Sequence, residues 1–327
     1  MTKAKAKRHR TVPCPLLSFN INNCGNVTMN ILKDFDTAIA KTENIPSGFV
    51  TEKGCYSSYV SNAAWQDHLS SMSPQHRCEY GDGSGGELEE KNGRPPKMAS
   101  FASSSRMTYL LSREIPGFSF EKKLTTVIGG LANLDGYCET EDRYVFVEAK
   151  CREPYSHKSP QLINQTYKDL YAYLQSKLPA VFSFETESVP GTRNMSVKFF
   201  CKGHEVVYFD IKQMLCHLLG VANFMLLGKD CSKPIQFLYL LYNPTKLRLP
   251  QDSGARIAHI YGETCTAANN YAFKDIFGVV VDYLIEQREY PRSGFEISTM
   301  KNKFKFALCD QESYESYFRS GSENKPL

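Results

Sequence analysis

The chain has 327 residues, enough for one large domain or two modest ones, and its hydrophobic content of 42% and charged content of 23% are those of an ordinary soluble globular protein. Its net charge of +4 permits nucleic-acid binding without requiring it. No apolar run approaches the roughly 18 residues of a membrane span, so we expect no membrane partner. No hydrophobic segment follows the basic N-terminus, which excludes a secretory signal peptide and leads us to expect a cytoplasmic protein with reduced cysteines.

The first 95 residues are expected to form an extension of helices and loops that packs on the domain after it. Asn30–Lys41 has helical spacing, and Tyr56 to about Ser70 is predicted to be a second helix. Gln75–Lys97 is predicted to be a loop, because four glycines fall within six of its positions. Glu87 in this loop is a minor candidate for a metal site, provided that the loop folds over that site.

The next segment predicts a helix followed by strands. Ala99–Arg113 follows a Pro-Pro break and has helical spacing, and Leu124–Ile128 is predicted to be a strand. Residues 131–150, LANLDGYCETEDRYVFVEAK, predict a hairpin with one strand over Leu131–Tyr137 and another over Tyr144–Ala149.

Three charged residues of this hairpin are expected to converge. Glu148 and Lys150 share one face of their strand, because side chains alternate between the two faces. Asp135 lies 13 positions before Glu148, a separation at which a hairpin can bring two carboxylates side by side. Such carboxylates repel each other, and a Mg²⁺ ion with oxygen ligands removes the repulsion. The backbone carbonyl of Ala149 is a candidate third ligand, and Lys150 would act on the attacking water or on the charge of a phosphate.

Asp135, followed by Glu148-Ala149-Lys150 at the end of an apolar strand, resembles the PD-(D/E)XK nuclease superfamily, the fold of many restriction enzymes and DNA-repair nucleases. The stretch from about Pro96 to Pro154 is similar, more particularly, to a bacterial restriction-endonuclease-like subgroup. Leu134 stands where the superfamily often has proline. The resemblance implies a Mg²⁺-dependent nuclease acting on DNA, with Mn²⁺ as a substitute cation. It also implies a homodimer as one way to cut both strands.

The resemblance implies further site residues before the hairpin. The first core helix of the superfamily often supplies another acidic ligand, and Glu114 and Glu121 are both candidates. Glu121 is preferred as a metal ligand, because it follows Phe118-x-Phe120, a pattern typical of an edge strand. Arg106 on the predicted helix is a candidate nucleic-acid contact. For Arg106, Glu114 and Glu121 the alternative is surface charge.

Two segments after the hairpin are interpreted as an insertion and a core helix. Residues of about 151–206 form the expected insertion, with a helix over Pro160–Lys177 on which Gln165 is a candidate nucleic-acid contact. Asp210–Leu227 has apolar residues at helical spacing and a good N-cap in Asp210. Gln213 and His217 share one face of this helix. Gln213 resembles the polar residue that supports the lysine in such sites, and His217 is expected to be a core or edge residue.

Pro234–Tyr242 is predicted to be a buried strand beside the hairpin. The order helix, three-strand meander, helix, strand is that of a restriction-endonuclease-like α/β core spanning residues 96–327, with N-terminal and internal helical additions. Helices near Glu263–Asn270 and Tyr271–Glu289 and an edge strand near residues 301–306 are also predicted. Two alternatives stay open: a nuclease-like module that binds nucleic acid or a protein without hydrolysis, and an unrelated α/β metabolic enzyme.

Overall fold

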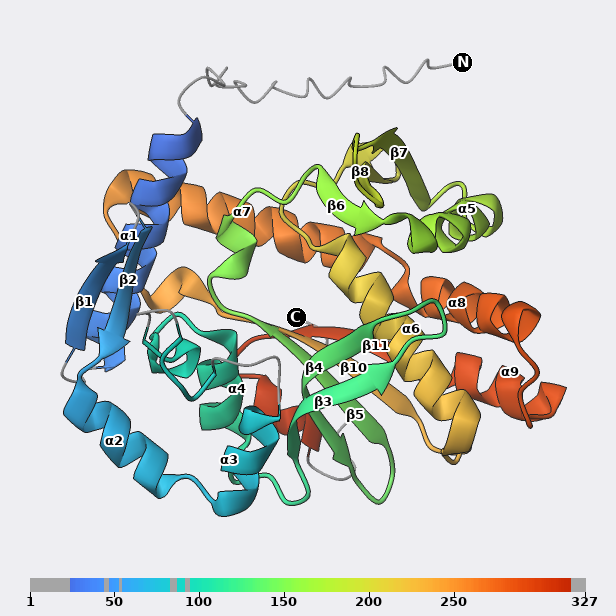
Figure 1. Cartoon of the computed structure of the whole chain (residues 1–327), viewed down its shortest axis with the longest axis horizontal. Helices are drawn as coiled ribbons and strands as arrows, with labels where there is room; N and C mark the ends of the chain where they lie inside the picture. Colours follow the sequence, from blue (N-terminus) through green and yellow to red (C-terminus); the bar gives the residue numbers. More distant parts are fainter. Residues whose placement is uncertain (1–23, 44–46, 53–54, 83–86, 92–94, 319–327) are drawn as a thin grey trace, which may run out of the picture.

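A mixed five-stranded sheet lies at the centre of the computed structural model, in the order β11-β10-β5-β4-β3 (Figure 1). Strands β3 (Ser119–Thr125), β4 (Leu131–Glu139) and β5 (Tyr144–Lys150) form an antiparallel meander. Strand β10 (Ile235–Leu241) runs parallel to β5, and β11 (Phe304–Cys309) runs parallel to β10 at the edge. The protein is therefore of the α/β class, as the sequence predicts. The structure describes residues 24–43, 47–52, 55–82, 87–91 and 95–318.

Strands β5 and β10 are buried along their whole length, which explains their nearly continuous apolar sequences. The predicted hairpin, the buried strand after Pro234 and the edge strand near residue 304 are confirmed. Between β3 and β4 the chain turns at Gly129 and Gly130, whose φ angles of 95° and 89° suit glycine because it has no Cβ.

Helix α6 (Ile211–Gly228) crosses one face of the sheet and is flanked by α8 (Phe273–Gln287) (Figure 1). Asp210 caps α6 by accepting a 2.9 Å hydrogen bond from the backbone N–H of Gln213, as predicted. Among the described residues, α6 alone is long and apolar enough to cross a membrane, and 67% of it is buried inside the protein. Such burial is also typical of a core helix.

The opposite face of the sheet is covered by α4 (Ser104–Ser112) and by N-terminal elements. Helix α1 (Cys24–Glu43) contacts α7 (Gln251–Asn270), and α3 (Pro74–Gly81) packs on β3. Side chains of α1, α2 and α3, including Phe35, Trp65 and Tyr80, share one hydrophobic core with Val145 and Val147 of β5. The N-terminal segment is therefore integral to this face of the molecule.

Residues between β5 and α6 form a separate small sheet beside α5 (Lys168–Lys177), so the internal addition predicted to be helical is mainly a sheet. Its strands are β6 (Gln161–Asn164), β7 (Phe182–Ser188), β8 (Asn194–Cys201) and β9 (His204–Glu205). The remaining elements are β1 (Ser47–Glu52), β2 (Cys55–Val60), α2 (Asn62–Ser71), α9 (Gly294–Asn302) and the short 3-10 helices η2 (Lys97–Ala99), η3 (Glu153–Tyr155), η4 (Gln165–Tyr167), η5 (Pro244–Lys246) and η6 (Tyr314–Phe318).

Several predicted elements are wrong in part. The helix predicted from Ala99 begins only at Ser104, and the strand predicted over Leu124–Ile128 ends at Thr125, the last residue of β3. The helix predicted from Tyr56 begins only at Asn62, because residues 55–60 pair with β1 as strand β2. The loop predicted from Gln75 contains α3, which Ser73 caps with a 3.1 Å hydrogen bond from the His76 N–H. The first residues of the helix predicted over 160–177 form β6, paired with β8. Residues 56–60 and 161–164 are both predicted to be helical, and in both segments pairing with a neighbouring strand overrides the local helical spacing.

Candidate active site

Asp135 lies where the ladder between β4 and β5 stops. The antiparallel register runs from Glu139 opposite Tyr144 to Gly136 opposite Val147. Beyond this last backbone pair, the side chain of Asp135 continues the contact between the two strands. Its Oδ2 accepts a 2.7 Å hydrogen bond from the Ala149 N–H. The N–H and C=O of a strand residue point to the same side, so the carbonyl of Ala149 also faces β4. The carboxylate of Asp135 and this carbonyl therefore lie on the same side of β5.

Glu148 and Lys150 form a buried ion pair on one face of β5. The ammonium Nζ of Lys150 donates to Oε1 of Glu148, and the side chains are only 9% and 2% exposed, respectively. Burial raises the pKa of Glu148 to about 7, although Lys150 opposes this shift. Burial lowers the pKa of Lys150, but the Glu148 carboxylate, together with Tyr239, Glu153 and Asp135, raises it overall, so the lysine stays protonated. Lys150 therefore acts as a fixed positive charge at neutral pH.

Asp135, Glu148 and Lys150 line one cavity of about 690 Å³, together with Glu121 and Gln213. The structure thus brings together the residues that the sequence proposes as catalytic or metal-binding. Burial and then the Glu148 carboxylate raise the pKa of Asp135 well above its usual range. Closely spaced carboxylates of this kind favour the presence of a cation.

Glu121 joins this cavity through an unusual backbone conformation. Its φ angle is 50°, in the left-handed region that residues other than glycine rarely adopt. The β3–β4 register continues on both sides of it, from Phe120 opposite Gly136 to Lys122 opposite Leu134, which places Glu121 level with Asp135. Burial, followed by the Asp135 carboxylate, raises the pKa of Glu121 to about 8. Backbone strain of this kind is concentrated at functional sites.

Glu114, the other acidic candidate, lies outside the cavity lining. Its side chain is 89% exposed and pairs with Arg113 at 3.4 Å. Glu87 does line the cavity, but both its oxygens already have partners. Its Oε1 accepts from Lys97 Nζ at 2.8 Å, and its Oε2 accepts from Ser105 Oγ at 2.9 Å. Of these acidic candidates, Glu121 therefore fits the site best.

The structure does not support Arg106 or Gln165 as nucleic-acid contacts at this cavity. The guanidinium of Arg106 is buried and donates a 2.9 Å hydrogen bond to Glu43, because this face of α4 packs inward. Gln165 is exposed in η4 and does not line the cavity. The basic residues that line it are Lys97, Lys150, Arg152 and Lys158. Arg152 and Lys158 follow the Glu-x-Lys triplet closely in the sequence, which is the signal that could have identified them.

His217 is the functional candidate that the sequence undervalues. It lies one turn after Gln213 on α6, and its Nδ1 is 3.3 Å from Oε2 of Glu148, without hydrogen-bond geometry. Burial, followed by the charge of Lys150, lowers the pKa of His217 to about 3, so the imidazole is neutral. The spacing of four residues from Gln213, which lines the cavity together with Glu148, is the sequence signal that points to this contact.

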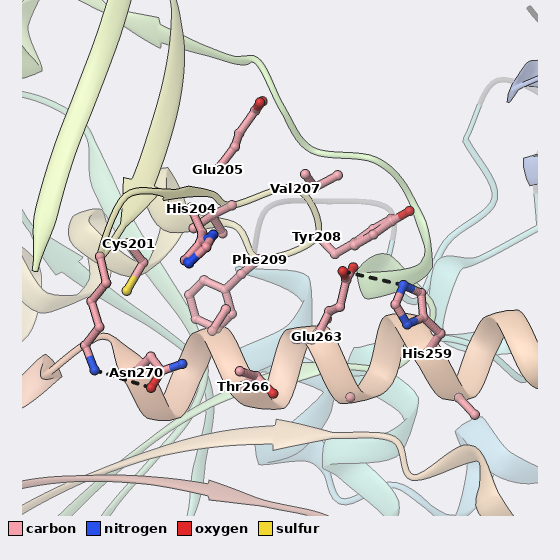
Figure 2. Close-up of a pocket in the computed structure, with 16 residues that line it drawn as sticks. Cys201, His204, Glu205, Val207, Tyr208, Phe209, His259, Glu263, Thr266 and Asn270 are labelled. Carbon is pink, nitrogen blue, oxygen red and sulfur yellow. Dashed lines mark hydrogen bonds and ion pairs between the residues drawn. The ribbon is translucent and has the colours of Figure 1, made fainter. Parts of the chain in front are cut away.

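A second cavity, of about 700 Å³, lies between α7 and residues 201–209 (Figure 2). It shares no lining residue with the first cavity. His259 and Glu263 face each other across one turn of α7 at 3.5 Å, but their side chains are 69% and 49% exposed. A large apolar pocket near Asp135 and Glu148 would favour the alternative of a metabolic enzyme, and this second cavity does not lie beside those residues.

Within the described part of the chain, no group of three or more His, Cys, Asp or Glu side chains is arranged to hold a metal ion. The donors at hand are the carboxylates of Asp135 and Glu148 and the carbonyl of Ala149, and Mg²⁺ is commonly bound by only one or two carboxylates. Comparison of the chain with protein-family models, curated proteins and solved structures found no match.

Proposed function

We propose that this protein is a Mg²⁺-dependent nuclease of the PD-(D/E)XK kind that hydrolyses phosphodiester bonds in DNA. The observation that carries the proposal is the meeting of Asp135, Glu148 and Lys150 at one cavity, on adjacent strands of a meander. The choice of DNA as the substrate rests on the sequence resemblance.

The element order supports the same proposal at the level of the fold. Helix α4 precedes the meander β3-β4-β5, and α6 leads into β10, which lies parallel to β5. This succession is the one expected of a restriction-endonuclease-like core, with β6 to β9 and α5 inserted between β5 and α6. Glu148 and Lys150 lie at the end of β5, and Asp135 lies level with Glu121, whose left-handed backbone conformation is of a kind concentrated at functional sites.

The residues present fit a divalent cation. Asp135, Glu148 and the carbonyl of Ala149 would hold it. Burial raises the pKa of both carboxyl groups, and the Glu148 carboxylate raises that of Asp135 further, so a cation would relieve this cost of burying them. A bound Mg²⁺ would activate the attacking water and neutralise charge that develops on the phosphate. The Ala149 N–H holds Asp135 in place through its 2.7 Å hydrogen bond.

Lys150 contributes a positive charge rather than a base, because its ammonium remains protonated beside Glu148. A buried ammonium stabilises the extra negative charge of the phosphate in the transition state. Gln213 lines the same cavity from the first turn of α6 and would orient the substrate or the attacking water.

The cavity also carries groups suited to the phosphate backbone. Lys97 and Lys158 line it, and the side chain of Lys97 is 60% exposed. Residues Ser103–Ser105 at the start of α4 also line it, and a helix N-terminus attracts anions. These groups replace Arg106 as the proposed DNA contacts.

The test is cleavage of supercoiled and linear DNA by the wild-type protein and by Glu148→Gln and Lys150→Met variants, with Mg²⁺ or with a chelator. We expect Mg²⁺-dependent cleavage that each substitution lowers by about a hundredfold or more, since each removes transition-state stabilisation. Glu114→Gln is the matched control, because that carboxylate is exposed and lies outside the cavity.

Equal cleavage by all four proteins, or cleavage that survives the chelator, would refute the proposal. DNA binding without any cleavage would instead support the alternative of a nuclease-like binding module.

A further inference from the structure

The N-terminal segment forms one wall of the cavity that holds Asp135 and Glu148. Tyr59 of β2 and Lys97 of η2 line this wall, together with Ser103–Ser105 at the start of α4. The rest of the lining comes from the central strands, from the segment after β5 and from the first turn of α6. The site is therefore enclosed by segments that both precede and follow the meander in the sequence.

The wall is held in place by buried contacts. The Glu87 side chain is buried and accepts hydrogen bonds from Lys97 Nζ at 2.8 Å and from Ser105 Oγ at 2.9 Å. Tyr59 forms an isolated antiparallel bridge with Ser100, and its side chain packs partly against the core that contains Val147. A segment with such contacts opens only when part of the core unfolds. We therefore expect the cavity to keep its dimensions when a substrate binds.

The catalytic charges lie deep in this cavity. Glu148 and Lys150 both line it, yet their side chains are only 2% and 9% exposed. A substrate phosphate must therefore enter the cavity to reach them, because it cannot meet them at the protein surface.

The size of the cavity disfavours duplex DNA. Its volume of about 690 Å³ is in the range of small-molecule pockets, and a sphere of that volume is about 11 Å across. The major groove of duplex DNA alone is about 12 Å wide, and a sugar–phosphate backbone flanks it on each side. A single strand is narrower and can turn its bases away from its backbone, so it can carry a phosphate to the bottom of the cavity.

The lining also suits an unpaired strand. Lys97 and Lys158 offer ammonium groups to phosphates. Tyr59 is the one aromatic residue among the described residues that line the cavity, and it is partly exposed. Aromatic rings bind unpaired bases by stacking, whereas the bases of a duplex already stack on each other.

We propose that this cavity binds a single-stranded segment of DNA, with an unpaired base against Tyr59 and a phosphate beside Lys150. The inference deepens the proposed function and rests on it for the choice of DNA. Duplex DNA is then a substrate only where its strands separate, as at an overhang. Negative supercoiling favours strand separation, so a supercoiled plasmid should be cleaved in preference to the relaxed closed circle.

Fluorescence anisotropy with three labelled DNAs of one sequence tests the proposal on the full chain. The DNAs are a single strand, a duplex with a single-stranded overhang and a blunt duplex with G·C-rich ends. Ca²⁺ replaces Mg²⁺, so that a hard cation neutralises the carboxylates. We expect the single strand and the overhang to bind about tenfold or more tightly than the blunt duplex. This comparison needs no variant.

Substitutions of Tyr59 test the base contact. Tyr59→Leu keeps apolar bulk but removes the ring, so it should weaken binding of the single strand by about tenfold and leave the blunt duplex unchanged. Tyr59→Phe keeps the ring and should keep the affinity. Phe295→Ala is the control, because Phe295 is 81% exposed and lies outside the cavity. It should change neither affinity.

The outcomes separate this inference from the nuclease proposal. Equal binding of the single strand and the blunt duplex overturns the inference and leaves DNA cleavage to be judged by its own assay. Unchanged single-strand binding by folded Tyr59→Leu overturns the base contact. A preference for the single strand without any cleavage supports the inference and refutes the nuclease. Failure of all three DNAs to bind overturns the inference.

Discussion

The carboxylate of Glu121 should make the metal-free protein less stable as the pH rises. Its pKa is raised from the ordinary 4.5 to about 8, first by burial and then by Asp135 and Glu87. Between these pH values the folded protein holds a proton that the unfolded chain has released. Stability is therefore greatest below pH 4.5 and is lost as the pH rises through 8. Glu121→Gln removes the charge and with it this loss.

The size of this loss of stability follows from the shift in the pKa of Glu121. Each pKa unit corresponds to about 1.4 kcal/mol, so the shift of Glu121 sets a ceiling of about 5 kcal/mol at high pH. Partial exposure and the nearby Lys97 reduce the effect, so we expect about 1–2 kcal/mol. Glu121→Gln should thus be more stable than wild type at pH 8, and the difference should shrink toward pH 5.

Urea unfolding of the metal-free proteins between pH 5 and pH 8 measures this difference. Glu114→Gln is the control, because it removes an exposed carboxylate of the same type. A divalent cation in the buffer should reduce the advantage of Glu121→Gln, since it neutralises the cluster in the wild-type protein. Parallel pH profiles for wild type and Glu121→Gln in chelator would refute this electrostatic account.

Two further substitutions test the packing around the site. Gly220→Ala should lower the free energy of unfolding in urea by about 1–3 kcal/mol, because the added Cβ would lie 2.7 Å from the Cβ of Ala132. Gly228→Ala in the same helix is the control. It adds a Cβ into open space and should leave the free energy of unfolding unchanged. Equal stability of the two variants would contradict this contact. Arg152→Ala should cost about 3 kcal/mol at pH 8, because it removes the 2.7 Å ion pair of the fully buried Asp36. Burial raises the pKa of Asp36 to about 7, so this cost should be smaller at pH 5, and a pH-independent cost would contradict the explanation.

The sequence alone identified the parts of the site that local patterns encode. The apolar run before Glu148 predicts a buried strand, and alternation places Glu148 and Lys150 on one face. The acidic turn between the strands predicts the hairpin that carries Asp135. Asp210 followed by apolar residues at helical spacing predicts α6, including its N-cap. These features depend on neighbours within about 20 residues of the chain, so the sequence pattern is enough to predict them.

Only the tertiary structure decided which other charged residues reach the cavity. Arg106 has the spacing of an exposed helix residue, but packing against the N-terminal helix buries it beside Glu43. Glu121 reaches Asp135 through a left-handed backbone conformation that no residue pattern signals. The unpaired Nδ1 of His217 appears only when α6 lies across β5. In each case the environment comes from segments distant in the chain, and burial and charge depend on those contacts rather than on local spacing.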